Sequence, residues 1–145
     1  MSAAQRAYLP VEREQLGYLH SNGAIAAGAL AHFVTDALRS SSPSSDEEGL
    51  EFIALQQATR HAIAAGHPVI VAAVDLPYSA VDTSADVPFV VTAPVPASDV
   101  VSFHLSDTAL DGLAGDRLEP DEELDDKEAV ELSWFDITEL PQILR

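Results

Sequence analysis

Hydrophobic residues recur along the chain in two patterns, continuous runs and strict alternation, and both are typical of β-strands. Val69 to Val74 form an unbroken apolar run rich in β-branched side chains, as expected of a strand buried on both faces. From residue 101 to residue 105, apolar side chains alternate with Ser102 and His104, which indicates a half-buried strand. Together with shorter apolar segments, these patterns predict about six strands, at residues 7–9, 30–35, 69–74, 87–93, 101–105 and 130–135.

The longest predicted helix covers residues 46–65. Ser45 and Glu48 have the spacing of a capping box at its start, and Gly66 is a strong stop signal after its last turn. The apolar residues of this segment do not form one narrow stripe on a helical wheel. We therefore expect the helix to pack on more than one side, either at the centre of the domain or against a partner chain.

Two shorter helices complete the predicted set, at residues 10–22 and 138–144, and Pro10 would suit the first turn of the earlier one. The order of the elements predicts an α+β fold. We expect a single-domain mixed β-sheet of about six strands, with one long central helix and shorter helices packed mainly on one face. The domain spans all 145 residues and includes a flexible serine-rich loop at 40–45 and an acidic linker at 106–128.

Among the features of the composition, charge most restricts the range of possible functions and partners. The formal net charge is −17, and 16 of the 24 Asp and Glu residues follow residue 75. Such a surface repels phosphate backbones and anionic membranes, so we expect neither nucleic acid nor membrane as a partner. It attracts cations and basic proteins. The charge therefore predicts a basic protein as partner. A second copy of the chain is the other predicted partner, because the long helix is too apolar for one buried side.

The chain contains no cysteine, which excludes disulfides, a thiol nucleophile and cysteine-based metal centres. Its first residues do not resemble a signal peptide, and its apolar runs are far shorter than the ~20 residues that span a bilayer. With an apolar fraction of 47%, the composition is that of a globular protein. We interpret the chain as a cytoplasmic protein, and we expect no cofactor.

Motifs for the common chemistries are missing from the sequence. The five histidines include no pair at the i, i+4 spacing of helical zinc sites, and neither a Gly-x-Ser-x-Gly elbow nor a phosphate-binding glycine loop is present. The acidic segment 116–128 lacks the glycine and the final glutamate of an EF-hand loop. Weak binding of divalent cations by this segment is one alternative function; a solvated linker is the other interpretation.

One set of polar residues is a candidate binding rim, because loops beyond strand ends often form ligand sites. An ion pair of Arg39 with Glu48, Glu51 or Asp75 is the ordinary structural interpretation of this set. A small hydrolase would instead need Asp75 and His104 close together in a concave site. The candidate rim residues are Arg39, Glu48, Glu51, Asp75 and His104.

Six short segments carry a resemblance to a known family: Tyr8–Pro10, Val34–Arg39, Asp46–Phe52, Val74–Pro77, Ala93–His104 and Leu132–Phe135. In these segments the chain resembles small acidic actinobacterial proteins that are classified only as a domain of unknown function. The resemblance implies a cytoplasmic single domain. It supplies no activity, cofactor or catalytic residue.

Three hypotheses about function follow from the sequence. The first is a non-enzymatic interaction module, as a homodimer or with a basic partner, which uses the acidic segment or an exposed edge strand. The second is a small hydrolase with a polar site at the strand ends. The third is the divalent-cation binder. Because a catalytic motif is missing from the sequence, the interaction module ranks first.

Overall fold

The computed structural model describes residues 4–41, 46–66, 68–82, 89–106 and 132–144. Its main feature is a seven-stranded sheet with the order β5-β6-β3-β1-β4-β8-β9, in which every neighbouring pair is antiparallel. The first strand of the chain, β1, lies in the middle of this sheet. The strands are β1 (Ala4–Pro10), β3 (Leu30–Phe33), β4 (Ile70–Pro77), β5 (Val81–Asp82), β6 (Phe89–Val91), β8 (Val100–Leu105) and β9 (Ser133–Asp136).

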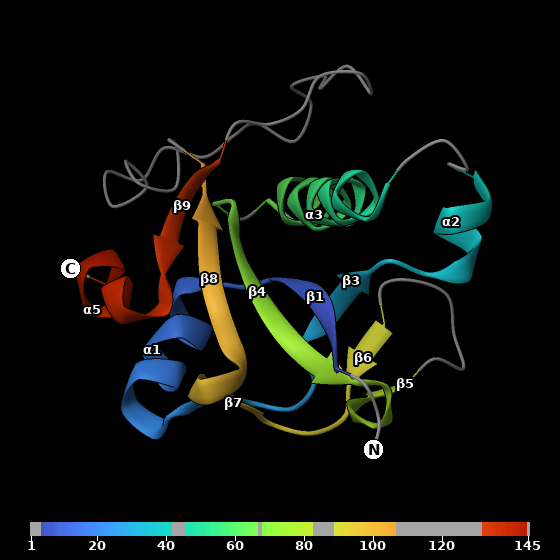
Figure 1. The fold of residues 1–145 in the computed structure, drawn as a ribbon. Helices are drawn as coiled ribbons and strands as arrows, with labels where there is room; N and C mark the ends of the chain where they lie inside the picture. Colours follow the sequence, from blue (N-terminus) through green and yellow to red (C-terminus); the bar gives the residue numbers. More distant parts are fainter. Residues whose placement is uncertain (1–3, 42–45, 67, 83–88, 107–131, 145) are drawn as a thin grey trace.

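Helices lie on both sides of this sheet (Figure 1). The long helix α3 (Glu47–Ala64) packs on one face, against β3, β1 and β4. The opposite face is covered by α1 (Arg13–Asn22), by α5 (Leu140–Ile143) and by a small two-stranded sheet. The remaining elements are β2 (Ala24–Ile25), β7 (Val95–Pro96), α2 (Asp36–Ser41) and the 3-10 turns η1 (Tyr78–Ala80), η2 (Ala97–Asp99) and η4 (Ile137–Glu139).

Two hydrophobic cores form because successive side chains of a strand point to opposite faces. In β1, Ala7 and Leu9 face α1, whereas Tyr8 faces α3. We call the two clusters the α1-side core and the α3-side core. The α3-side core is Tyr8, Ala54, Ala58, Ala62, Ile63, Val69, Val71 and Ala73.

The apolar run of β4 explains why both faces need covering. Val71 and Ala73 belong to the α3-side core, and Ala72 and Val74 belong to the α1-side core. The prediction of a strand buried on both faces is therefore confirmed. The α+β class and the single long helix are also confirmed, but the sheet is antiparallel rather than mixed, and helices cover both of its faces.

The start of α3 differs from the sequence prediction. Asp46, not Ser45, is the N-cap, and its Oδ1 accepts a hydrogen bond from the backbone N–H of Gly49 at 2.8 Å. The helix ends before Gly66, whose φ of 77° is in the left-handed region that glycine adopts without strain. α3 buries a stripe on the sheet that includes Leu50, Ala54 and Ala58, while Phe52 is half exposed.

Replacing Asp46 by alanine should lower the free energy of unfolding by about 0.5–2 kcal/mol, because the N–H of Gly49 loses its acceptor. Asp46→Asn keeps an acceptor at the same place and should retain most of the stability. Urea denaturation of the three proteins measures the difference. Equal losses for the two variants would show that the cap contributes through charge rather than through its hydrogen bond.

α1 begins later than predicted. Pro10 belongs to β1, and the helix starts at Arg13, with Glu12 as its N-cap. Gln15 accepts a hydrogen bond from the backbone N–H of Glu12 at 2.7 Å, which satisfies a donor at the helix start. Arg13 then donates to the backbone carbonyls of Ile143 and Leu144, at the end of α5, and so joins α1 to α5.

The two predicted loops are placed only in part. Ser40 and Ser41 of the serine-rich loop belong to α2, and residues 42–45 lie outside the described residues. Of the acidic linker, only Ser106 is described, and it is buried. Within the described part of the chain, every helix is too short or too polar to cross a membrane.

Candidate functional site

A polar cluster lies on the α3 side of the sheet, where β1 and β4 run beyond the apolar core. Arg6 is directly opposite Asp75 in the strand register, so the two side chains share one face. The Nε–H of Arg6 donates to Oδ1 of Asp75 at 2.8 Å. This hydrogen bond and the charge of Asp75 raise the pKa of Arg6.

Tyr8 and Glu51 extend this cluster from two other positions. Tyr8 is two residues from Arg6 on the same face of β1, and it is buried beneath α3. Burial, and then the negative charge of Glu51 on α3, raise the pKa of Tyr8 to about 12. The charge of Glu51 also raises the pKa of Arg6, so its carboxylate lies near both side chains.

β8 brings Ser102 and His104 to the same face, opposite Ala73 and Val71 of β4. Ser102 Oγ and His104 Nε2 are 3.3 Å apart. Burial, and then the positive charge of Arg6, lower the pKa of His104. On the other side of His104, the edge strand β9 places Trp134, whose side chain is 59% exposed.

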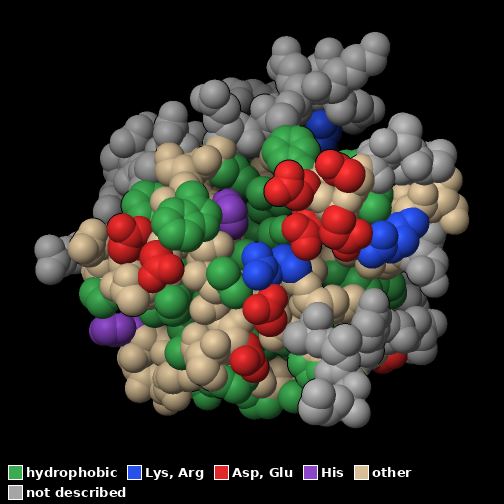
Figure 2. All heavy atoms as spheres, viewed as in Figure 1, with side chains coloured by type: hydrophobic (Ala, Val, Ile, Leu, Met, Phe, Trp, Pro, Cys, Tyr) green, Lys and Arg blue, Asp and Glu red, His purple; other side chains and the backbone are tan. Residues whose placement is uncertain are grey.

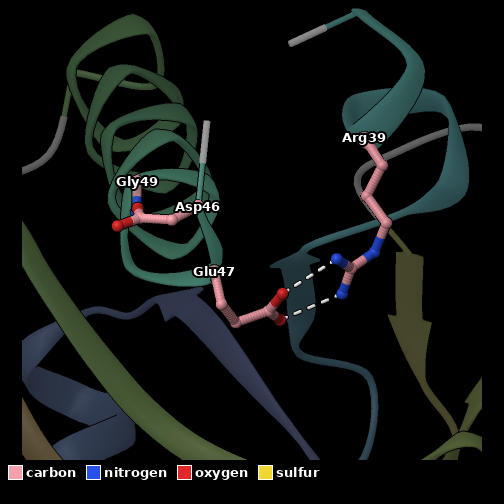
Figure 3. Close-up of polar contacts among 4 residues, drawn as sticks. All are labelled: Arg39, Asp46, Glu47 and Gly49. Atoms are coloured by element: carbon pink, nitrogen blue, oxygen red, sulfur yellow. Dashed lines mark hydrogen bonds and ion pairs between the residues drawn. The ribbon is translucent and has the colours of Figure 1, made fainter. Parts of the chain in front are cut away.

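Three of the five predicted rim residues therefore share the α3 side of the sheet: Glu51, Asp75 and His104. Arg39 lies at the end of α2 and forms a bidentate ion pair with Glu47, with N–O distances of 2.8 and 2.9 Å (Figure 3). The hydrogen bond from Arg39 lowers the pKa of Glu47. Glu48, the fifth rim residue, is exposed in the first turn of α3.

The expectation that Arg39 pairs with Glu48, Glu51 or Asp75 did not anticipate Glu47, and Asp75 pairs with Arg6 instead. Arg6 was missed because it lies outside the strand predicted at residues 7–9 and, next to Gln5, belongs to no recognised motif. Arg6 and Tyr8 are two residues apart, so both side chains lie on the same face of a strand. This spacing was the signal in the sequence that could have identified Arg6. Figure 2 shows acidic side chains gathered over α3, with basic side chains beside them.

The geometry does not assemble the proposed hydrolase pair. Asp75 is four residues along β4 from Val71, the residue opposite His104, and at ~3.3 Å per residue this separates them by roughly 13 Å. The Asp75 carboxylate is engaged by Arg6, and Ser102 beside His104 is only 2% exposed, so its hydroxyl is closed to a substrate. Asp75 and His104 therefore lie on the same face of the sheet but take part in different contacts.

A separate pocket lies at the other end of α3. It has a volume of about 240 Å³ and is lined by the end of β1, the start of α1, the β2–β3 turn and the last turn of α3. His61 lines it, and His61 Nδ1 is 3.0 Å from Nε2 of the buried His32. Among the described residues, no cluster contains the three or more His, Asp or Glu side chains that would hold a metal ion. The segment 116–128, the predicted cation binder, lies outside them.

Comparison with known proteins places the whole described fold in one family. A family model matches residues 5–144, and the family is described as one of unknown function. Searches of curated proteins and of solved structures found no match to the chain. The match extends from β1 to the end of α5, so it includes every element that builds the polar cluster and the pocket.

Proposed function

Because the chain belongs to DUF6912, a family of unknown function, we propose a function from the geometry. The protein is a non-enzymatic binding module that recognises a basic segment of a partner protein on the α3 side of its sheet. The observation that carries this proposal is Trp134, a large aromatic side chain that is 59% exposed on an edge strand.

Trp134 has the position and chemistry of a recognition residue. Tryptophan is enriched where proteins bind one another, and its ring face attracts Lys and Arg side chains. Leu132, just before β9, packs on the α3-side core together with Leu55 of α3. The exposed ring therefore follows a segment that is anchored beside α3.

The acidic side chains near this face favour a cationic partner. Asp46, Glu47 and Glu48 are exposed around the first turn of α3, and Glu51 follows one turn later. An extended basic segment would be attracted by these carboxylates and would place a cation over Trp134. Attraction of this kind speeds association and weakens as salt screens it.

The same charge argues against self-association. Two copies of the chain each carry a formal charge of −17, so any face-to-face contact between them is opposed by repulsion. A basic partner reverses the sign of this interaction. We therefore favour the basic partner over the homodimer, and light scattering at low and high salt distinguishes the two.

Replacing Trp134 by alanine should weaken binding of a fluorescein-labelled Lys/Arg-rich peptide by about fivefold, since a cation–ring contact is worth about 1 kcal/mol. The substitution changes no charge, so it leaves non-specific attraction intact. Tyr18→Ala is the matched control, because Tyr18 is 48% exposed on α1, on the opposite side of the sheet. Fluorescence anisotropy measures both affinities.

The proposal is wrong if the peptide binds the Trp134 and Tyr18 variants equally well. A second readout uses the fact that the chain has one tryptophan. Adding unlabelled peptide to the unmodified protein should change the Trp134 emission. An unchanged spectrum at saturating peptide would place the binding surface elsewhere.

A further inference from the structure

The pocket beside His61 is separate from the surface around Trp134 and has its own chemistry. Most of its lining is apolar: Pro10, Val11, Ala29, Leu30, Ala62 and Ala65. Three polar side chains interrupt this lining, namely Glu12, Gln15 and His61. A concave apolar site with a few polar groups is the usual form of a small-molecule site.

The contact between His32 and His61 fixes which ring nitrogen holds a proton. His32 is 6% exposed, and its Nδ1 is buried without a hydrogen-bond partner. If His61 donated the shared hydrogen bond, His32 would carry its own proton on Nδ1, and a buried N–H would lack an acceptor. Orphaned buried N–H groups are rarer in proteins than orphaned acceptors. His32 Nε2–H is therefore the donor, and His61 Nδ1 accepts at 3.0 Å.

This assignment makes His61 a hydrogen-bond donor toward the pocket. A neutral imidazole that accepts at Nδ1 carries its proton on Nε2. His61 lines the pocket and is only partly buried, so we take this N–H as the donor available to a molecule there.

Gln15 supplies a second donor. Its Oε1 is occupied by the backbone N–H of Glu12 at 2.7 Å, which leaves the side-chain NH₂ as the group available to a ligand. His61 belongs to α3 and Gln15 to α1, so the two donors enter the pocket lining from different helices.

Charge in the lining selects against anions. The Glu12 carboxylate is part of the pocket and accepts from the N–H of Gln15. His61 lies in the last turn of α3, where the helix dipole is negative. An anion would meet both of these negative charges, whereas a neutral ligand with an acceptor would meet two N–H groups.

We propose that this pocket binds a small uncharged molecule with a hydrogen-bond acceptor, such as an aromatic amide, whose acceptor meets His61 and Gln15. This site goes beyond the proposed recognition of a basic segment and does not depend on it. The volume of about 240 Å³ admits a single aromatic ring with a short polar substituent.

Two probes of nearly equal shape test the chemistry of the ligand: benzamide and benzoate. Benzamide is neutral and has a carbonyl acceptor, whereas benzoate is an anion. Titrations followed by NMR should show benzamide binding with a dissociation constant of about 1 mM, as expected for so small a ligand. Benzoate should bind at least about tenfold more weakly.

Two variants locate the binding. Ala65 is an exposed residue of the lining, so Ala65→Phe should fill the pocket without disturbing the core and should weaken benzamide binding about tenfold or more. Trp134→Ala is the matched control and should leave benzamide binding unchanged, which separates this site from the proposed protein-binding surface. Nitrogen chemical shifts of the His61 ring should show the proton on Nε2.

The proposal is overturned if benzamide fails to bind at 10 mM or binds Ala65→Phe as well as the unmodified protein. It is also overturned if benzoate binds as tightly as benzamide, or if the proton of His61 is on Nδ1. Weaker peptide binding in Trp134→Ala with intact benzamide binding supports both sites independently.

Discussion

Replacing Phe103 by alanine should lower the free energy of unfolding by about 3–5 kcal/mol. Phe103 is fully buried in β8, belongs to the α1-side core and is paired with Ala72 of β4 and Phe135 of β9. Its removal leaves a cavity between three strands and the helices that cover them. Because a domain is typically stable by only about 5–15 kcal/mol, the loss should be visible as a large shift of the urea midpoint.

The same substitution at an exposed site is the control. Phe52 on α3 is 50% exposed, so Phe52→Ala should change stability by no more than about 0.5 kcal/mol. If Phe103→Ala does not fold, Phe103→Leu keeps most of the buried volume and should lose less than about 1.5 kcal/mol. Equal effects at positions 52 and 103 would contradict the placement of Phe103 in the core.

Acidification from pH 6.5 to 4 should lower the free energy of unfolding by about 3 kcal/mol through His32 alone. Burial, and then the neighbouring His61, lower the pKa of His32 to about 4 from its ordinary value of 6.5. Below pH 6.5 the unfolded state takes up a proton that the folded state refuses, so stability falls as the pH falls. The pKa of His32 differs by about 2.5 units between the unfolded and the folded state, and each unit corresponds to about 1.4 kcal/mol.

Urea denaturation at several pH values measures how the free energy of unfolding depends on pH. His32→Gln should remove the part of this dependence that comes from His32. His104 also has a lowered pKa and contributes in the same direction, so some pH dependence should remain in the variant. His20→Gln is the control, because His20 is exposed on α1. A slope in His32→Gln equal to that of the unmodified protein would show that His32 is accessible to protons in the folded state.

Local patterns predicted the elements of this fold because they depend on neighbouring residues only. The run Val69–Val74 anticipated β4, and the alternation around Ser102 and His104 anticipated β8. Strand direction was not predictable in this way, because an apolar run buries itself equally well in parallel and antiparallel sheets. The antiparallel order follows from contacts between distant segments, such as β1 with β4.

The candidate site was predictable only in part for the same reason. Asp75 and His104 could be placed at a strand end and on a polar strand face, but their partners depended on register. Register pairs Arg6 with Asp75 and places Trp134 opposite His104, across separations of 69 and 30 residues. The His32–His61 contact joins a strand to a helix and has no counterpart in any spacing motif.

The central position of β1 has a consequence for synthesis of the chain. At ~5–20 residues per second, a ribosome needs roughly 3–12 s to add the 60 residues that separate Pro10 from Ile70, where β4 begins. During this interval the nascent β1 lacks the neighbour that later pairs with all seven of its residues. An unpaired edge of this length is a template for aggregation. Nascent chains stalled before residue 70 should therefore be the species that most needs chaperone protection.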